Sequence, residues 1–180
     1  QQSALVIYFV AMNENEMTLG TNYPQNRFGG PSVIGWHCSE KYDGVRAFWD
    51  GERMWSRGGF EITPPPWFNL PRGQKLDGEI WCGRGRFQEA RVAVQHGGDW
   101  SNARFIAFDA PDAPGTWTER VATIPAALRI EYTTINTRGE FLDAFRAVKA
   151  IGGEGLMLRH PTARGYETGR TSRLLKVKHL

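Results

Sequence analysis

The chain has 180 residues, of which 41% are apolar and 12% aromatic, so it can bury one real core and two domains would be cramped. Its 22 lysines and arginines against 19 aspartates and glutamates give a net charge of +3, which is compatible with a polyanionic partner but does not require one. Cys38 and Cys82 are far apart in the sequence, and neither lies near a pair of residues with metal-ligand spacing, which argues against a zinc site or a disulfide framework. A single disulfide between the two cysteines stays open.

The first regular unit expected along the chain is a β-hairpin. The apolar run 4–12 is too short for a membrane span and lacks the basic flank of a signal peptide, so it predicts a buried strand or helix start and no membrane partner. Residues 13–35, rich in Asn, Gly, Pro and Thr, predict an irregular connection. The alternating segments 45–49 and 53–56 then flank Asp50-Gly51, which is the strongest short-range hairpin signal.

The rest of the chain predicts more strands than helices. Residues 62–67 predict a loop, because their three consecutive prolines lack backbone donors. We expect strands at 75–81, 104–108, 155–159 and 173–178, and a helix at 86–96. Capping-box spacing opens two further helices, at Thr116 with Glu119 and at Thr137 with Glu140. Strands and helices do not alternate one for one, so the fold class is α+β, with largely antiparallel sheets flanked by helices.

A candidate nucleophile precedes the hairpin, in Glu40-Lys41-Tyr42-Asp43-Gly44-Val45-Arg46. A lysine amine attacks only when it is unprotonated, a state that burial or neighbouring cations favour. Taken alone, Lys-x-Asp-Gly is more typical of a solvated turn.

Five further segments follow the lysine in order: Ser-Arg-Gly-Gly at 56–59, Leu-Asp-Gly-Glu-Ile-Trp at 76–81, Phe-Ile-Ala-Phe-Asp at 105–109, Glu-Gly-Leu-Met-Leu-Arg at 154–159 and Leu-Leu-Lys-Val-Lys at 174–178. Together the six segments resemble the motifs of the covalent nucleotidyltransferases, which are the ATP-dependent DNA ligases, RNA ligases and mRNA capping enzymes. The resemblance covers about residues 35–178. The segments around Lys41 and Glu79 look most like the small bacterial ATP-dependent DNA ligases, several of which are exported.

This resemblance implies an ATP-grasp-like nucleotidyltransferase fold and one adenylation domain over 1–180, with an irregular N-terminal segment at 1–34 and a motif-bearing core at 35–178. Lys41 would attack the α-phosphorus of ATP, expel pyrophosphate and carry AMP as a covalent lysyl-AMP. The residues implied to bind the nucleotide are Glu40, Arg46, Arg57, Glu79, Phe108, Glu154, Lys176 and Lys178.

The implied roles fit the chemistry of these side chains. Arg46 and Arg57 would hold ribose and phosphates, because a guanidinium suits bidentate contact with such oxygens. Phe108 would stack on adenine, while Phe105 is expected in the core. Lys176 and Lys178 alternate with apolar residues, so on a strand they share one face. Without the other motifs, core packing of Phe108 and an ordinary edge strand for the two lysines are the better readings.

Metal and nucleic-acid partners follow from the same resemblance. Glu79 and Glu154 are the expected Mg²⁺ ligands, since charge developing on the phosphates needs neutralising. A solvent-facing strand end and a plain glycine turn are the alternatives for these two. Arg84 and Arg86 are candidate contacts to nicked double-stranded DNA, for which a solvated loop is an equal alternative.

The sequence departs from the family pattern at two places. The family's adenylation domain is followed by an OB-fold domain, and nothing resembling it occurs in these 180 residues. We therefore expect a monomer that binds nucleotide, adenylates itself slowly and seals nicks poorly unless that domain or a partner supplies the rest. Ser39 stands where many larger ligases have an acidic or other polar residue near the adenine edge, so ATP over GTP rests on the resemblance alone.

Several alternatives stay open at this point. The same chemistry on RNA, by an RNA ligase or a cap-forming guanylyltransferase, is one. A non-catalytic nucleotide or nucleic-acid binding module is another, although the intact set of Lys41, Glu79, Glu154, Lys176 and Lys178 argues against it. The sequence leaves the compartment open between cytoplasmic and, if a leader was removed before Gln1, periplasmic.

Overall fold

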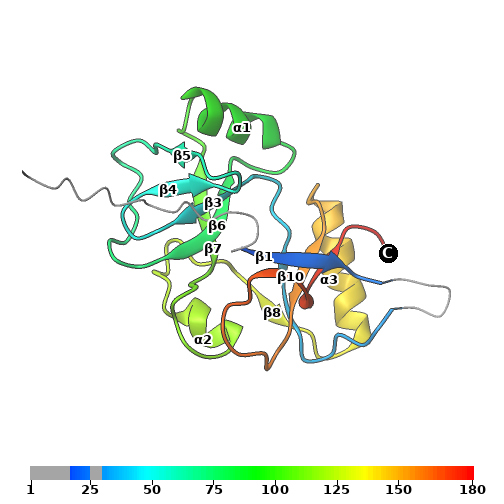
Figure 1. Cartoon of the computed structure of the whole chain (residues 1–180). Helices are drawn as coiled ribbons and strands as arrows, with labels where there is room; N and C mark the ends of the chain where they lie inside the picture. The colour runs from blue at the N-terminus through cyan, green and yellow to red at the C-terminus, as the bar shows by residue number, and fades with distance from the viewer. Residues whose placement is uncertain (1–16, 25–29) are drawn as a thin grey trace, which may run out of the picture.

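The computed structural model describes residues 17–24 and 30–180 and contains two five-stranded sheets (Figure 1). The first sheet has the strand order β5-β4-β3-β6-β7 and the second has the order β1-β10-β9-β2-β8. The strands are β1 Thr18–Asn22, β2 His37–Glu40, β3 Val45–Trp49, β4 Met54–Ser56, β5 Glu61–Ile62, β6 Leu76–Trp81, β7 Arg104–Asp109, β8 Thr133–Thr134, β9 Leu156–Arg159 and β10 Gly169–Val177. The helices are α1 Phe87–His96, α2 Trp117–Ala122 and α3 Arg138–Ala150.

The predicted hairpin is confirmed as β3 and β4, with Trp49 opposite Met54 and Ala47 opposite Ser56. The Asp50 carboxylate closes its turn by accepting hydrogen bonds from the backbone N–H of Arg53 at 2.6 Å and from the Trp55 indole at 2.8 Å. The predicted loop at 62–67 starts one residue later, because Ile62 is buried and pairs with Met54 in the short strand β5.

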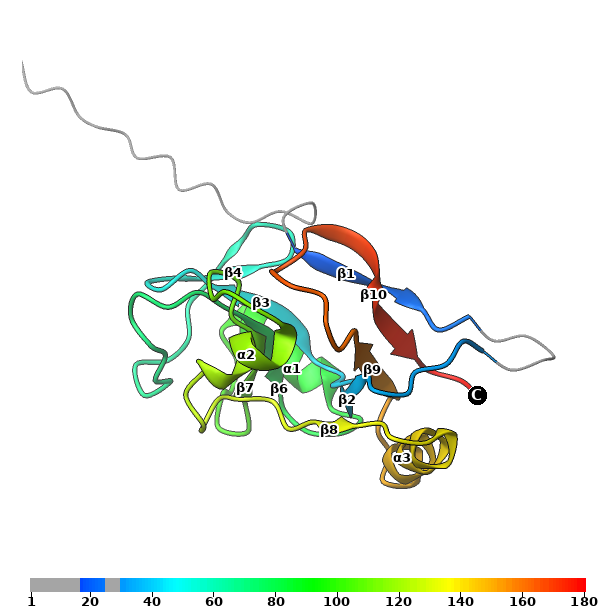
Figure 2. The same cartoon turned by 90° about the horizontal axis from the view of Figure 1, so that it is seen from below.

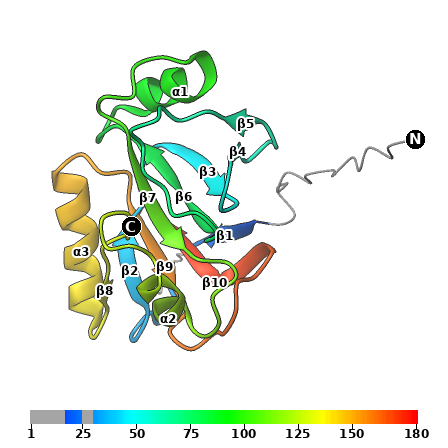
Figure 3. The ribbon, with the colours of Figure 1, turned by 90° about the vertical axis from the view of Figure 1, so that its left-hand side faces the viewer.

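The three helices begin near the predicted residues. Thr116 caps α2, where the Glu119 carboxylate accepts from the Thr116 backbone N–H at 3.3 Å. Thr137 caps α3 by accepting from the Glu140 N–H at 3.1 Å. Helix α1 contacts β3 and β6 of the first sheet, whereas α3 contacts β9 of the second sheet (Figure 3).

The second sheet contains three strands that the sequence analysis did not predict, which are β1, β2 and β8. β1 lies inside the segment expected to be irregular and pairs in parallel with β10, while β2 pairs with β9. The short run Thr18–Asn22 has no clear apolar alternation, so its strand conformation depends on a partner about 150 residues away. β10 also begins at Gly169, before the predicted start at Arg173. All other strand pairs are antiparallel, which confirms the α+β class.

Each sheet has its own buried apolar core. The core of the first sheet includes Leu76, Ile80 and Phe105, and that of the second includes Phe141 and Leu158. Figure 2 shows α3 beside β8 and β9 at the far end from the first sheet. Cys38 and Cys82 are both free and buried, so the disulfide left open by the sequence is not formed.

The predicted apolar element at 4–12 lies outside the described residues. Within residues 17–24 and 30–180, no helix is long and apolar enough to span a membrane.

Candidate active site

A cavity of about 330 Å³ is lined by residues of both sheets. The first sheet contributes Arg46 from β3, Glu79 from β6 and Phe108 from β7, and the second contributes Met157 from β9 and Lys176 from β10. Seven lysine and arginine side chains line this cavity against two glutamates. Because like charges in a confined space repel, this excess of positive charge suits a polyanionic ligand.

Lys41 lies on the cavity wall, in the link between β2 and β3, and forms an ion pair with Glu154. Its Nζ is 2.7 Å from Glu154 Oε2, and Lys178 Nζ is 2.9 Å from the other carboxylate oxygen. Partial burial of Glu154 opposes ionisation, but hydrogen bonds from the two lysines outweigh it and lower the pKa of the carboxyl. The ion pair holds the Lys41 side chain in place on the cavity wall, and attack by its amine requires that the amine lose a proton and leave Glu154.

Glycines let the backbones around Lys41 approach closely. The Lys41 N–H donates to the Gly155 carbonyl at 2.8 Å, which places Lys41 beside Glu154. A Cβ on Gly155 would lie 2.0 Å from the Val177 carbonyl oxygen, and one on Gly44 would lie 2.2 Å from that of Ile80. These contacts are shorter than real Cβ atoms show, so the two glycines are required for chain crossings rather than only for ligand access.

The guanidinium fork of Arg46 is directed at Asp77. Nε donates to Asp77 Oδ1 at 2.7 Å and Nη2 donates to Oδ2 at 2.6 Å. Nη2 also donates to the Thr18 carbonyl at 3.1 Å. Arg46 was expected to make a bidentate contact with the nucleotide, but here it makes that contact with the buried Asp77 carboxylate. Arg46 still lines the cavity.

Phe105 and Phe108 lie on opposite faces of β7, as expected for residues three apart on a strand. Phe105 is buried in the first core, as predicted, while Phe108 is half-buried and lines the cavity. The Arg46 guanidinium carbon lies 4.9 Å and that of Arg159 5.6 Å from the centroid of the Phe108 ring. Phe108 therefore lies where a ligand in the cavity can reach it, and its stacking on a base stays a prediction.

Glu79 stands in the cavity opposite Arg46 across the β3–β6 pair. Burial raises the pKa of this carboxyl to about 7, although Arg46 and Lys41 pull in the other direction. Glu79 is thus close to half-ionised at neutral pH. Among the described residues, no group of three or more His, Cys, Asp or Glu side chains is arranged to hold a metal ion.

The pH dependence of stability should change when Glu79 is replaced by glutamine. The folded protein keeps this proton up to about pH 7, whereas the ordinary pKa of the group is 4.5. The free energy of unfolding of the wild type should therefore fall, relative to Glu79→Gln, by about 1–3 kcal/mol as the pH rises through this window. Urea unfolding of both proteins from pH 4 to pH 8 measures the difference, and parallel curves would contradict the assignment.

The two candidate DNA contacts lie near the site and are engaged with carboxylates. Arg84 donates to both Glu40 oxygens, at 2.9 and 2.8 Å, and Arg86 pairs with Glu89 at 2.6 Å. Glu40 lines the cavity, and its carboxylate is bound by Arg84. Arg57, Lys176 and Lys178 line the cavity as expected.

Comparison with known proteins identifies the family. No protein-family model matches the sequence. A DNA ligase of Haemophilus influenzae is 31% identical over 94% of this chain and 65% of its own length. A structure from a study of Lig E DNA ligases is 30% identical, with a TM-score of 0.78, over 91% of this chain and 68% of that one. This chain belongs to the ATP-dependent DNA ligases.

A third relative extends the similarity beyond bacteria. Chlorella virus DNA ligase-adenylate superposes with a TM-score of 0.69 at 25% identity over 92% of this chain and 67% of that one. The fold is therefore the nucleotidyltransferase fold of ligase adenylation domains. This ligase chain spans 65% of the length of the Haemophilus relative.

Several cavity residues of this ligase chain were missed by sequence reasoning. Leu19 and Gly20 come from the unpredicted strand β1, and Met157 and Arg159 come from within a recognised motif. Arg159 is buried, donates to the Ser39 hydroxyl at 2.8 Å and lies over the Trp117 ring. An arginine at the end of an otherwise apolar strand is the sequence signal that could have identified it.

Proposed function

We propose that this chain carries out the first step of DNA ligation, the transfer of AMP from ATP to Lys41. The observation that supports this most directly is the position of Lys41 on the wall of a cavity where seven cations face two carboxylates. One relative with the same fold was solved as a ligase-adenylate. A triphosphate carries enough negative charge to balance such a site.

The chemistry is a displacement at phosphorus. The neutral Lys41 amine attacks the α-phosphorus, a P–N bond forms, and the bond to the bridging oxygen breaks to release pyrophosphate. The amine proton leaves during this step. In the next step a 5′-phosphate oxygen of DNA attacks the same phosphorus, which frees Lys41 and forms DNA-adenylate. A 3′-hydroxyl then attacks the 5′-phosphate, seals the nick and releases AMP.

Seven of the cavity residues have a proposed role in nucleotide binding. Phe108 stacks on the base, while Glu79 accepts from the ribose hydroxyls. Arg46 and Arg57 contact ribose and phosphate oxygens, and Lys176 and Lys178 neutralise the triphosphate. Glu40 lies at the cavity edge, beside the nucleophile.

Glu79 and Glu154 are the proposed holders of Mg²⁺. They fit this ion because Mg²⁺ is usually held by one or two carboxylates together with substrate phosphates, so no larger cluster is needed. When bound, the ion neutralises charge on the phosphoryl and pyrophosphate groups.

Nicked double-stranded DNA is the proposed partner, with the chain acting as a monomeric adenylation domain. Arg84 and Arg86 are the proposed phosphate contacts. Both would exchange a carboxylate partner for a phosphate, so each guanidinium would stay paired with an anion. An OB-fold domain, or a partner protein, is proposed to complete the grip on the duplex.

The test is incubation with ATP labelled at its α-phosphorus and Mg²⁺, followed by denaturing electrophoresis. We expect a labelled protein band with ATP and none with labelled GTP. A chase with nicked duplex DNA should move the label from the protein to the DNA. Label from GTP alone would indicate a capping-type enzyme, and ATP binding without any covalent label would indicate a non-catalytic module.

A further inference from the structure

A ring of hydrogen bonds that includes a tyrosine lies beside the cavity. Tyr166 donates its hydroxyl proton to Asp77 Oδ2 at 2.6 Å and accepts from the Thr18 backbone N–H at 3.1 Å. Arg46 Nη2 donates to the same Asp77 oxygen and to the Thr18 carbonyl. Asp77 is completely buried, so these donors replace the water that its carboxylate would otherwise bind.

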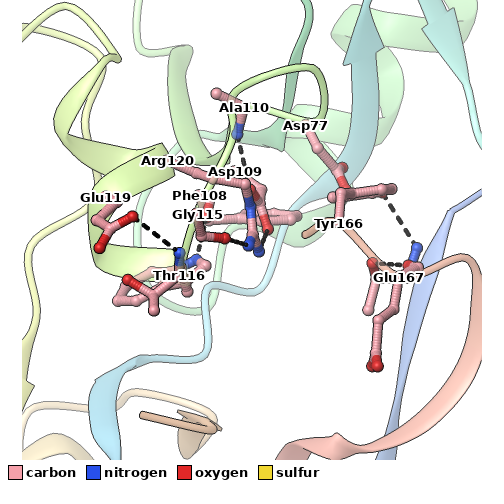
Figure 4. A network of polar contacts seen from close by, with 12 residues as sticks. Asp77, Phe108, Asp109, Ala110, Gly115, Thr116, Glu119, Arg120, Tyr166 and Glu167 are labelled. Carbon is pink, nitrogen blue, oxygen red and sulfur yellow. Dashed lines mark hydrogen bonds and ion pairs between the residues drawn. The ribbon is translucent and has the colours of Figure 1, made fainter. Parts of the chain in front are cut away.

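This ring joins parts of the chain that are far apart in sequence. Arg46 and Asp77 belong to β3 and β6 of the first sheet, and Thr18 to β1 of the second. Tyr166 lies in the segment between β9 and β10, and its side chain approaches Asp77 in Figure 4. The ring therefore ties the first sheet to both β1 and the segment that leads into the strand carrying Lys176.

Within the ring, one nitrogen of the Arg46 guanidinium, Nη1, is left to contact a ligand. Nε and Nη2 are used by Asp77 and Thr18, whereas Nη1 makes no hydrogen bond to any described residue. Since Arg46 lines the cavity, Nη1 is the group left to contact a nucleotide. Its direction depends on how firmly Asp77 holds the rest of the fork.

We propose that Tyr166 is a positioning residue for the nucleotide: its hydroxyl orients Asp77, and through it directs Arg46 Nη1 into the cavity. This inference rests on the proposed function for its kinetic test. Burial and the neighbouring Asp77 raise the pKa of Tyr166, so the hydroxyl keeps its proton and remains a donor. None of the six sequence motifs contains Tyr166.

The test is Tyr166→Phe, which removes only the hydroxyl. We expect the ATP concentration that gives half-maximal labelling rate to rise on the order of 10-fold, as for loss of one hydrogen bond to a charged group. The matched control is Tyr23→Phe, because the Tyr23 hydroxyl donates to the Pro31 carbonyl at 3.0 Å away from the cavity. A purely structural role would lower the melting temperature and the labelled fraction without changing this concentration.

A double-mutant cycle tests whether Tyr166 acts through Arg46. In an Arg46→Lys background, Tyr166→Phe should cause little further change in the kinetics, because the fork on Asp77 is already lost. Full additivity of the two substitutions would overturn the proposal, as would unchanged kinetics in the single variant.

A spectroscopic measurement separates this inference from the proposed function. The Arg46 Nε–H resonance can be identified by its loss in Arg46→Lys, and its exchange with water reports the hydrogen bond to Asp77. We expect faster exchange in Tyr166→Phe than in wild type and Tyr23→Phe. This result supports the positioning role even if the wild type takes no label, whereas equal exchange in all three proteins overturns it.

Discussion

Replacing Lys41 with arginine is expected to abolish covalent labelling by ATP, a loss of at least ~1,000-fold. Arginine keeps the positive charge and can keep the ion pair with Glu154, whose carboxylate lies 2.7 Å from Lys41 Nζ. A guanidinium stays protonated, so it has no free electron pair with which to attack phosphorus. The variant should therefore fold and bind ATP, yet form no adenylate that survives denaturing electrophoresis.

Lys75→Arg is the matched control for this substitution. Lys75 is exposed, lies before β6 and pairs with Asp112 at 3.6 Å, away from the cavity. It should label like the wild type. Label that persists in Lys41→Arg would show that another side chain, such as Lys176 or Lys178, is the nucleophile.

Replacing Glu154 with glutamine is expected to slow adenylation by roughly 100-fold, the size that a small misplacement of a reacting group can cost. The carboxylate is shared by Lys41 and Lys178, at 2.7 and 2.9 Å. Glutamine has nearly the same shape but no charge, so both ammonium groups lose their ion-pair partner and are free to move. The single-turnover rate of labelling at saturating ATP and Mg²⁺ measures the effect.

Glu89→Gln is a well-matched control for this experiment. The Glu89 side chain is 27% exposed and is also ion-paired, while that of Glu154 is 25% exposed. Loss of a partly buried ion pair by itself should therefore affect both variants alike. Equal labelling rates in Glu154→Gln and the wild type would remove Glu154 from the reaction, and an equal loss in both variants would point to a general effect on folding.

The local elements were predictable where short-range signals are strong. Asp50-Gly51 between alternating segments specifies a tight reversal, and β3 and β4 form around it. The capping residues Thr116 and Thr137 likewise begin their helices, because their contacts are made within one turn. Strand β1 was not predictable, since its hydrogen bonds go to β10 and no local pattern encodes that pairing.

For the candidate site, the sequence indicated which residues take part, and the structure showed where their side chains point. The resemblance of the ordered motifs to the covalent nucleotidyltransferases singled out Lys41, Glu79, Glu154, Lys176 and Lys178, since that resemblance depends on residue type and order along the chain. The direction of each side chain was not contained in the motifs. Arg46 was expected to contact ribose and phosphate oxygens, and only the structure shows that its Nε and Nη2 donate to Asp77.

The sequence by itself determined the family, the fold class and Lys41 as the candidate nucleophile, since these depend on residue type and order. Only the tertiary structure decided what Lys41 faces, which is Glu154 and, through it, Lys178. It also decided that β1 and Tyr166 belong to the surroundings of the cavity, because both reach Asp77 or Arg46 across more than 25 residues of chain. Contacts of that range arise from sheet pairing and buried charge, and these are properties of the folded chain as a whole.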